Sequence, residues 1–327
     1  MTRSFPDEAG TVAITLGDPR GIGPAVTLGA LDRLGGARHR PGRSIVIGAD
    51  NLRILKELPS DVEVIGVGAW DGTERSAGRI AGRAIQKAVQ LALDGVAQAV
   101  VTAPIHKPSL RAAGWTAAGH TELLREMTGV EQVGMLMAAE QTRLGAPLRV
   151  LLATTHLPLR SVPDALSAEL IVRQTVLLSG ALETWWGLAT PRIALCALNP
   201  HASDDGLFGN EEALVLTPAV SQARGKGLNL TGPLPADTVF TRALSGEFDA
   251  VVAPYHDVGM AAFKTAAFGT GVNVTLGLPF PRTSPDHGTA FDLATEPERA
   301  NPSSMIEAIR LARRLARRSF DTESVDV

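Results

Sequence analysis

Residues 11–34, TVAITLGDPRGIGPAVTLGALDRL, hold the pattern from which we derive the fold. A short apolar run is followed by a turn rich in glycine and proline and then by apolar residues at helical spacing. The same alternation joins SIVIG at 44–48 to NLRILKEL at 51–58, and a helical segment at about 76–94 to AQAVVTAPI at 97–105. Strands that alternate with helices in this way form a mostly parallel sheet covered by helices, so the chain is an α/β protein.

A second series of strand-like runs predicts further parallel strands. These are LRVLLATTH at 148–156, RIALCALNPH at 192–201 and FDAVVAPYHD at 248–257. Each run leads into a histidine, His156, His201 or His256. Because open α/β sheets bind ligands at the C-terminal ends of their strands, we expect these three histidines to be neighbours. Their spacing lacks the HExxH or CxxC signature of a metal site, so a metal and an anion are both candidate ligands.

Size and composition restrict the class of protein. A chain of 327 residues is expected to form two domains. With 20% charged residues and a net charge of −3, it offers no general attraction for nucleic acid. The single cysteine, Cys196, lies in an apolar run and cannot form an intrachain disulfide. No signal-peptide pattern and no long apolar run occurs, so we expect a cytoplasmic protein without membrane partners.

The stretch 255–292, YHDVGMAAFKTAAFGTGVNVTLGLPFPRTSPDHGTAFD, is the strongest candidate for a functional site. Its polar groups lie on both sides of an apolar, strand-like core at 272–279. An ordinary charged surface loop is the alternative, but polar groups at the ends of a buried strand favour a ligand site. The polar residues are His256, Asp257, Lys264, Asn273, Arg282, Asp286, His287 and Asp292.

Two further segments have features of binding sites. The Gly-rich turn at 17–24, GDPRGIGP, opens a helix whose free N–H groups suit an anion, but its spacing is not the GxGxxG of a dinucleotide fingerprint. The C-terminal segment 303–320 has arginines at helical spacing, which we expect to form a solvated face rather than a surface for nucleic acid or lipid. These arginines are Arg310, Arg313, Arg314, Arg317 and Arg318.

Eight strings, in order along nearly the whole chain, carry a family resemblance. They are GDPRGIGP, VTAPIHK, GHTE, TTHLPLRSVPDAL, LNPHASDDGLFGNEE, GPLPADT, YHD and GVNVTLGLPFPRTSPDHGTAFDLA. Each is modest alone, but the ordered set is specific. The chain resembles the 4-hydroxythreonine-4-phosphate dehydrogenases of pyridoxal phosphate biosynthesis and their paralogues.

The resemblance implies two α/β/α domains of the isocitrate/isopropylmalate dehydrogenase type, with the active site in the cleft between them. Residues 1–115 with 290–327 would form the first domain, and 116–289 the second, which carries metal and dimer contacts. It also implies a homodimer whose shared site binds one divalent cation, zinc, cobalt, magnesium or manganese. The implied ligands are His156 and His201 of one subunit and His256 of the partner subunit.

The resemblance further implies the reaction and its residues. NAD would oxidise the C3 hydroxyl of 4-phosphooxy-threonine (4-hydroxythreonine 4-phosphate), and the resulting β-keto acid would lose carbon dioxide to give 3-amino-2-oxopropyl phosphate. The implied substrate-binding residues are His120, Thr121, Lys264, Asn273 and Arg282. The catalytic candidates are Lys264, Asp237 and Asp257. The two aspartates would orient histidines or move protons, or serve only as turn or cap residues.

A more distant resemblance concerns the cofactor. The segment 286–308 is similar to the adenosine-binding loop of the β-decarboxylating isocitrate and isopropylmalate dehydrogenases. That likeness implies NAD, with NADP as the alternative, and no separate Rossmann domain. The implied cofactor-binding residues are His287, Gly288, Thr289, Asp292 and Asn301.

Four residues depart from the pattern expected for the family: Arg20, Ser203, Val258 and Thr270. The departures leave the three histidines intact but open the choice of substrate. One alternative is a paralogue that oxidises 4-phosphothreonate, 4-phosphoerythronate or a cyclic dihydrodiol dicarboxylate. A remoter one is a phosphate acyltransferase with the same fold, against which a histidine-dependent metal requirement would argue. Another is a non-catalytic binder, against which the joint presence of His156, His201, His256, Lys264 and Arg282 argues.

Overall fold

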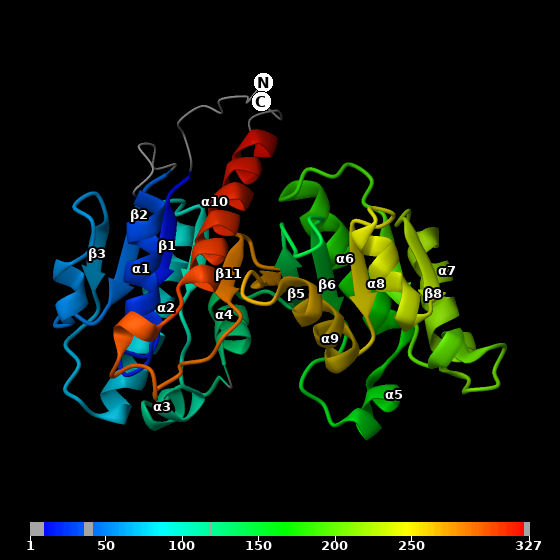
Figure 1. The fold of residues 1–327 in the computed structure, drawn as a ribbon, viewed down its shortest axis with the longest axis horizontal. Helices are drawn as coiled ribbons and strands as arrows, with labels where there is room; N and C mark the ends of the chain where they lie inside the picture. Colours follow the sequence, from blue (N-terminus) through cyan, green and yellow to red (C-terminus); the bar gives the residue numbers. More distant parts are fainter. Residues whose placement is uncertain (1–9, 36–41, 118, 324–327) are drawn as a thin grey trace. The chain divides into compact units, whose positions relative to one another are not determined.

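The computed structural model describes residues 10–35, 42–117 and 119–323, and the chain divides into two compact units (Figure 1). The first unit comprises the described residues of Met1–Gln132 and Leu278–Val327, and the second comprises Val133–Gly277. The second unit is therefore shorter at both ends than the expected 116–289. The reason is that α4 (His120–Thr128) packs on α2 (Glu74–Leu93) and β11 (Arg282–Pro285) pairs with β4 (Ala99–Thr102), all within the first unit.

The first unit is built on parallel strands in the order β3-β2-β1-β4-β11. Its other strands are β1 (Val12–Thr15), β2 (Ser44–Gly48) and β3 (Glu63–Gly66). Its other helices are α1 (Gly23–Gly35), η1 (Arg53–Lys56), α3 (Lys107–Ala112), η5 (Pro297–Arg299) and α10 (Ser303–Glu323). Every residue of β1, β2 and β4 is buried, as expected of parallel strands covered on both faces. The parallel α/β arrangement predicted from 11–105 is confirmed.

Glycines allow α2 and α3 to approach closely. A Cβ atom on Gly78 would lie 1.8 Å from the carbonyl oxygen of Ser109, and one on Gly82 would lie 2.1 Å from the ring of Trp115. Neither distance is compatible with a side chain, so α2 needs glycine at both positions.

The second unit has the strand order β10-β5-β6-β9-β7-β8. Its strands are β5 (Gly134–Ala139), β6 (Leu148–Leu152), β7 (Ile193–Cys196), β8 (Leu230–Leu234), β9 (Ala250–Ala253) and β10 (Val272–Leu276). β5 is antiparallel to both β10 and β6, whereas β6, β9, β7 and β8 are parallel to one another. Its helical segments are η2 (Leu159–Ser161), α5 (Val162–Ala165), α6 (Ala168–Thr184), η3 (Pro200–Ser203), η4 (Glu212–Leu216), α7 (Thr217–Gly225), α8 (Ala236–Leu244) and α9 (His256–Ala267).

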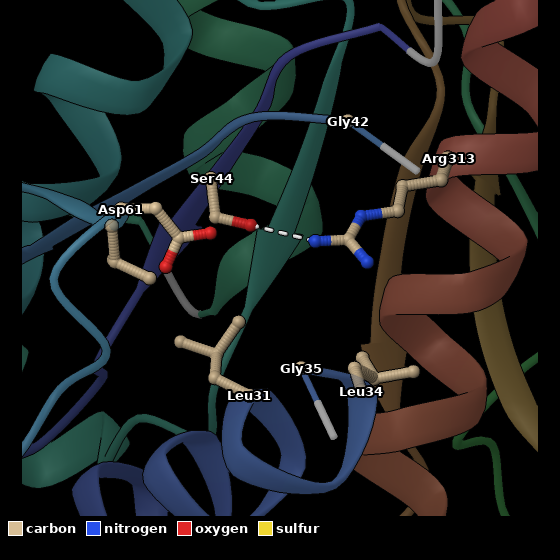
Figure 2. Close-up of a pocket in the computed structure, with 8 residues that line it drawn as sticks. Leu31, Leu34, Gly35, Gly42, Ser44, Asp61 and Arg313 are labelled. Carbon is tan, nitrogen blue, oxygen red and sulfur yellow. Dashed lines mark hydrogen bonds between the residues drawn. The ribbon is translucent and has the colours of Figure 1, made fainter. Parts of the chain in front are cut away.

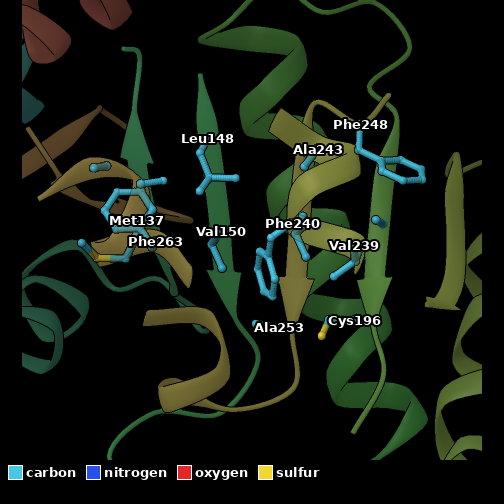
Figure 3. Close-up of a cluster of buried hydrophobic side chains, with 14 of the residues drawn as sticks. Met137, Leu148, Val150, Cys196, Val239, Phe240, Ala243, Phe248, Ala253 and Phe263 are labelled. Atoms are coloured by element: carbon cyan, nitrogen blue, oxygen red, sulfur yellow. The ribbon is translucent and has the colours of Figure 1, made fainter. Parts of the chain in front are cut away.

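One buried cluster of the second unit lies between its strands and helices α8 and α9 (Figure 3). Phe263 of α9 is fully buried and belongs to the same cluster as Leu148 and Val150 of β6 and Phe240 of α8. Val258, one of the departures from the family pattern, packs against this cluster. Helix α9, which begins at His256, is therefore held on the sheet by a well-packed apolar face.

Helix α10 corrects one expectation. Helical spacing predicts a solvated basic face for Arg313, but this residue is only 6% exposed and its Nη2 donates a hydrogen bond to Ser44 Oγ at 2.9 Å (Figure 2). The cavity beside it has a volume of about 10 Å³, enough for about one water molecule. Arg310 and Arg314 are exposed as expected, while the side chain of Arg318 lies outside the described residues. Arg313 is thus part of the packing of the first unit.

No single helix among the described residues is both long enough and apolar enough to span a membrane. The segments Leu159–Ala165 and Ala168–Thr184 meet that test only when taken together across a bend of 89°.

Candidate functional site

Two of the three strand-end histidines meet in the second unit. β6 and β7 both pair in parallel with β9, so the C-terminal ends of these strands lie at one edge. The ring centroids of His156, beyond β6, and His256, beyond β9, are 5.4 Å apart. Both rings belong to one chain, whereas the resemblance takes the third metal ligand, His256, from the partner subunit; their separation therefore shows only that the two strand ends are neighbours.

Asp257 orients one member of the pair. Its Oδ1 lies 2.9 Å from Nδ1 of His256, and the His256 side chain is 34% exposed. A carboxylate in this position favours the tautomer with the proton on Nδ1, which leaves Nε2 free to bind a cation. The fit of His256 to a divalent cation thus rests on its tautomer and on the partial exposure of its ring.

His201 lies in an unusual turn. Its φ is 54°, and the four residues that follow it also have positive φ angles. Outside glycine this region costs roughly 1–2 kcal/mol per residue, so neighbouring contacts must hold the turn in place. The ring of His201 contacts Phe208 at a centroid distance of 6.2 Å. Over the described ranges, 10–35, 42–117 and 119–323, no three His, Cys, Asp or Glu side chains form a ready-made metal site.

The first unit brings together a second group of predicted residues. His120 is the first residue of α4, and its Nε2 is buried without a hydrogen-bond partner. Burial, with Arg282 and Lys107 nearby, holds the pKa of His120 well below its usual value, so its ring is neutral at physiological pH. Lys107 was not among the predicted residues, although it lies in the string VTAPIHK.

Arg282 is the charged member of this group. Its side chain is 2% exposed, and its guanidinium donates to Thr102 Oγ1, from Nε at 3.1 Å. Burial lowers the pKa of Arg282 to about 9, and the group still carries its charge at neutral pH. A buried cation beside a neutral imidazole suits an anionic ligand group such as carboxylate or phosphate.

The Gly-rich turn contacts the predicted cofactor loop within the first unit. The backbone N–H of Ile22 donates to the carbonyl of Thr289 at 2.9 Å. Arg20, a departure from the family pattern, lies 5.0 Å from the centroid of the Phe291 ring, a cation–π distance. The Arg20 guanidinium is held in turn by the buried carboxylate of Asp18 at 2.9 Å.

The remaining predicted residues take varied positions. Asn301 Oδ1 accepts hydrogen bonds from the N–H and hydroxyl of Ser303, the first residue of α10. His287 has its Nδ1 3.0 Å from the Gly288 carbonyl, and its Nε2 is buried without a partner. Lys264 Nζ lies 5.9 Å from the ring centroid of Phe268. Asp237 and Asp292 are exposed, whereas Thr121, Thr289 and Asn273 are half-buried.

A cavity of about 490 Å³ lies in the first unit beside the residues that flank Asn301. α1 and η1 contribute Leu28, Asp32 and Arg53 to its wall. The thiol of Cys196, by contrast, is no candidate for chemistry, because burial raises its pKa to about 12.

Comparison with known proteins identifies the family. The model of the pyridoxal phosphate biosynthetic protein PdxA matches residues 39–312. The chain belongs to the PdxA family. Among PdxA-family relatives, a 4-hydroxythreonine-4-phosphate dehydrogenase from Cupriavidus pinatubonensis is 41% identical over 330 residues, covering 92% of this chain and 93% of the relative.

Solved structures agree with this family. The crystal structure of 4-hydroxythreonine-4-phosphate dehydrogenase from Klebsiella pneumoniae matches with a TM-score of 0.84 at 37% identity, covering 94% of this chain and 98% of that one. A terephthalate 1,2-cis-dihydrodiol dehydrogenase from Burkholderia xenovorans LB400 is more distant, with a TM-score of 0.65 at 26% identity over 94% of this chain and 98% of that one. Both the predicted family and the predicted fold class are confirmed.

Proposed function

We propose that this PdxA-family protein oxidises 4-phosphooxy-threonine at its C3 hydroxyl with NAD, in a reaction that requires a divalent cation and ends in decarboxylation to 3-amino-2-oxopropyl phosphate. The observation that carries the proposal is the contact of Asp257 with Nδ1 of His256, which leaves Nε2 of this strand-end histidine available to a cation. The relatives named as 4-hydroxythreonine-4-phosphate dehydrogenases support the choice of substrate.

The cation is held, in this proposal, by His156 and His201 of one subunit and by His256 of the partner subunit in a homodimer. Bound there, it would supply positive charge that stabilises an oxyanion and lowers the pKa of an adjacent hydroxyl. The segments around His156 and His201 also expose large apolar side chains, which supports a surface covered by a second copy of the chain. These side chains are Leu157, Leu159, Leu207, Phe208 and Leu214.

The substrate would be held by charge and by hydrogen bonds. Buried Arg282 supplies a cation for the carboxylate or phosphate, and neutral His120 can hydrogen-bond without adding charge. Thr121 and Asn273 would add polar contacts, and Lys264 would add a further cation or move the proton of the C3 hydroxyl. Asp237 is the other candidate for moving a proton.

NAD is proposed to bind the loop that carries His287, Gly288, Thr289, Asp292 and Asn301. The buried, unpartnered Nε2 of His287 supports this assignment, because a buried polar atom normally has a partner. The cavity that flanks Asn301 supports it further, because its volume suits a ligand of nucleoside size. NADP remains the alternative. We propose the cytoplasm as the location, with small molecules and a second subunit as the only partners.

A second candidate function is oxidation of 4-phosphothreonate, 4-phosphoerythronate or a dihydrodiol dicarboxylate. The likeness to the terephthalate dihydrodiol dehydrogenase favours keeping it. Among the departures from the family pattern, Thr270 donates its hydroxyl to the Gln141 carbonyl at 3.3 Å, and the half-buried Val258 packs against the core cluster. Neither side chain therefore replaces the polar contact to substrate that the usual family residue at its position would make.

The deciding experiment measures NAD reduction with 4-phosphooxy-threonine, 4-phosphothreonate and 4-phosphoerythronate, with and without added Zn²⁺ or Co²⁺. We expect metal-dependent turnover that is fastest with 4-phosphooxy-threonine and is lost in His256→Ala. Faster turnover of a phosphorylated sugar acid would establish the second function instead. Activity that is indifferent to both metal and His256 would overturn the proposal.

A further inference from the structure

We infer that Glu212 is a positioning residue, which holds His201 where it can bind the divalent cation. The inference rests on the proposed function, in which His201 is a metal ligand. Glu212 does not touch the cation or the substrate in this proposal, and it acts only through the backbone that carries His201.

The carboxylate of Glu212 is buried and fully used. The residue is 3% exposed, and its Oε1 accepts the backbone N–H groups of Leu198 at 2.9 Å and Asn199 at 2.7 Å. Its Oε2 accepts the side-chain Nδ2 of Asn199 at 2.8 Å. Burying a carboxylate costs free energy unless its oxygens accept hydrogen bonds. These contacts therefore fix the position of the backbone at Leu198 and Asn199.

That fixed point lies directly before the turn of His201. Leu198 and Asn199 follow the end of β7 at Cys196, and His201 is two residues further on. The far side of the turn is closed by backbone N–H groups of Gly206 and Phe208, which donate to the Ser203 carbonyl at 3.1 and 3.0 Å. Because residues 201–205 all have positive φ angles, the turn keeps its shape only while both ends are held.

The charge of Glu212 is what makes it suited to this task. A single carboxylate oxygen accepts two converging N–H groups, which a glutamine can imitate only through its one carbonyl oxygen. The amide nitrogen of glutamine would face the Nδ2 donor of Asn199 and repel it. Glu212→Gln therefore keeps the size of the side chain but weakens its hold on the turn.

The neighbouring Glu211 provides a matched control. Its Oε2 also accepts Nδ2 of Asn199, at 2.8 Å, but no backbone N–H before His201 donates to it. Glu211→Gln changes the same charge one residue away and leaves both backbone bonds in place.

The test is a Co²⁺ titration of the full-length wild-type, Glu212→Gln, Glu211→Gln and His201→Ala proteins, read from the visible ligand-field bands of the bound ion. We expect Glu212→Gln to bind Co²⁺ about 10- to 100-fold more weakly, with altered bands, at an unchanged fold by circular dichroism. Glu211→Gln should stay within about twofold of wild type. A role in stability alone would lower the melting temperature of Glu212→Gln without moving the bands.

Two results separate the failure of this inference from that of the proposed function. If Glu212→Gln binds Co²⁺ with wild-type affinity and bands while His201→Ala does not, Glu212 has no positioning role. If His201→Ala itself binds like wild type, the assignment of His201 as a ligand is wrong. Should Glu212→Gln fail to fold, Glu212→Asp takes its place, because the shorter side chain keeps the charge but cannot reach both backbone N–H groups. The same 10- to 100-fold weaker Co²⁺ binding is then expected of Glu212→Asp, and wild-type binding would overturn the inference.

Discussion

Several of the candidate site residues have an unusual backbone conformation or protonation state. His201 and the residues after it adopt positive φ angles, and His120 is neutral beside two cations. Both features arise from tertiary surroundings rather than from local sequence. Each has a measurable consequence.

Replacing Ser203 by glycine should stabilise the protein. Ser203 has a φ of 69°, where glycine has no steric penalty, so we expect a gain of about 1 kcal/mol in the free energy of unfolding. Ser221→Gly is the control, because Ser221 lies within α7 and glycine should there cost roughly 0.5 kcal/mol. Urea unfolding measures both. A loss of stability in Ser203→Gly would mean that the hydroxymethyl group contributes more than the strain costs.

His120 should make the stability of the protein sensitive to acid. Burial lowers its pKa in the folded state, so the unfolded chain binds the proton more tightly. The contribution of the neutral ring is then complete above about pH 6.5 and is lost as the pH falls toward the folded-state pKa. His120→Gln should flatten the dependence of the urea midpoint on pH in this window. Identical slopes in both proteins would contradict the assignment of a buried neutral histidine.

The site residues could be predicted in part from the sequence. Strand ends and family strings pointed to His156 and His256, which lie together in the structure. Lys107 and Glu212 were missed, because their roles depend on burial and on partners distant in the chain. Glu212 lies within the string LNPHASDDGLFGNEE, but only the fold shows that its carboxylate is buried.

Among the elements, the pair α2 and α3 depends most directly on small residues. We expect Gly78→Ala to lower the free energy of unfolding by about 1–3 kcal/mol, because the new methyl group would collide with the Ser109 carbonyl. Gly180→Ala in α6 is the matched control, since a Cβ there meets nothing within 4 Å. It should gain about 0.5–1 kcal/mol from helix propensity. Equal effects at both positions would show that α3 moves away at little cost.

The burial of Arg313 and the direction of β5 did not follow from the sequence pattern. The helical period of α10 was predicted correctly, yet Arg313 is buried against Ser44. Periodicity assigns a residue to a face of the helix, but the neighbouring strands decide how far that face is covered. The antiparallel pairs of β5 with β10 and β6 were likewise absent from the prediction, because apolar runs do not encode strand direction.

At the scale of the whole molecule, a bound cation should stabilise the folded protein. A ligand at about 100 times its Kd adds roughly 2.7 kcal/mol when it binds only the folded state. We therefore expect Zn²⁺ to raise the melting temperature of wild type, and a chelator to reverse the rise. His256→Ala should show little change. The same rise in both proteins would place the stabilising ion elsewhere.

The α/β class and the parallel sheet of the first unit followed from strand and helix alternation alone. The limits of the two units did not follow, because they depend on which strands each returning segment pairs with. β11 is four residues long and carries Arg282, so its pairing with β4 assigns both the strand and the arginine to the first unit.

That pairing also has a consequence for synthesis on the ribosome. Arg282 is 180 residues beyond Thr102, its hydrogen-bond partner, and the whole second unit is translated between them. At a translation rate of about 5–20 residues per second, β11 is synthesised roughly 10–35 s after β4. The nascent chain therefore presents an unpaired apolar strand edge throughout that delay, and the second unit, although encoded later, is the first that can be completed.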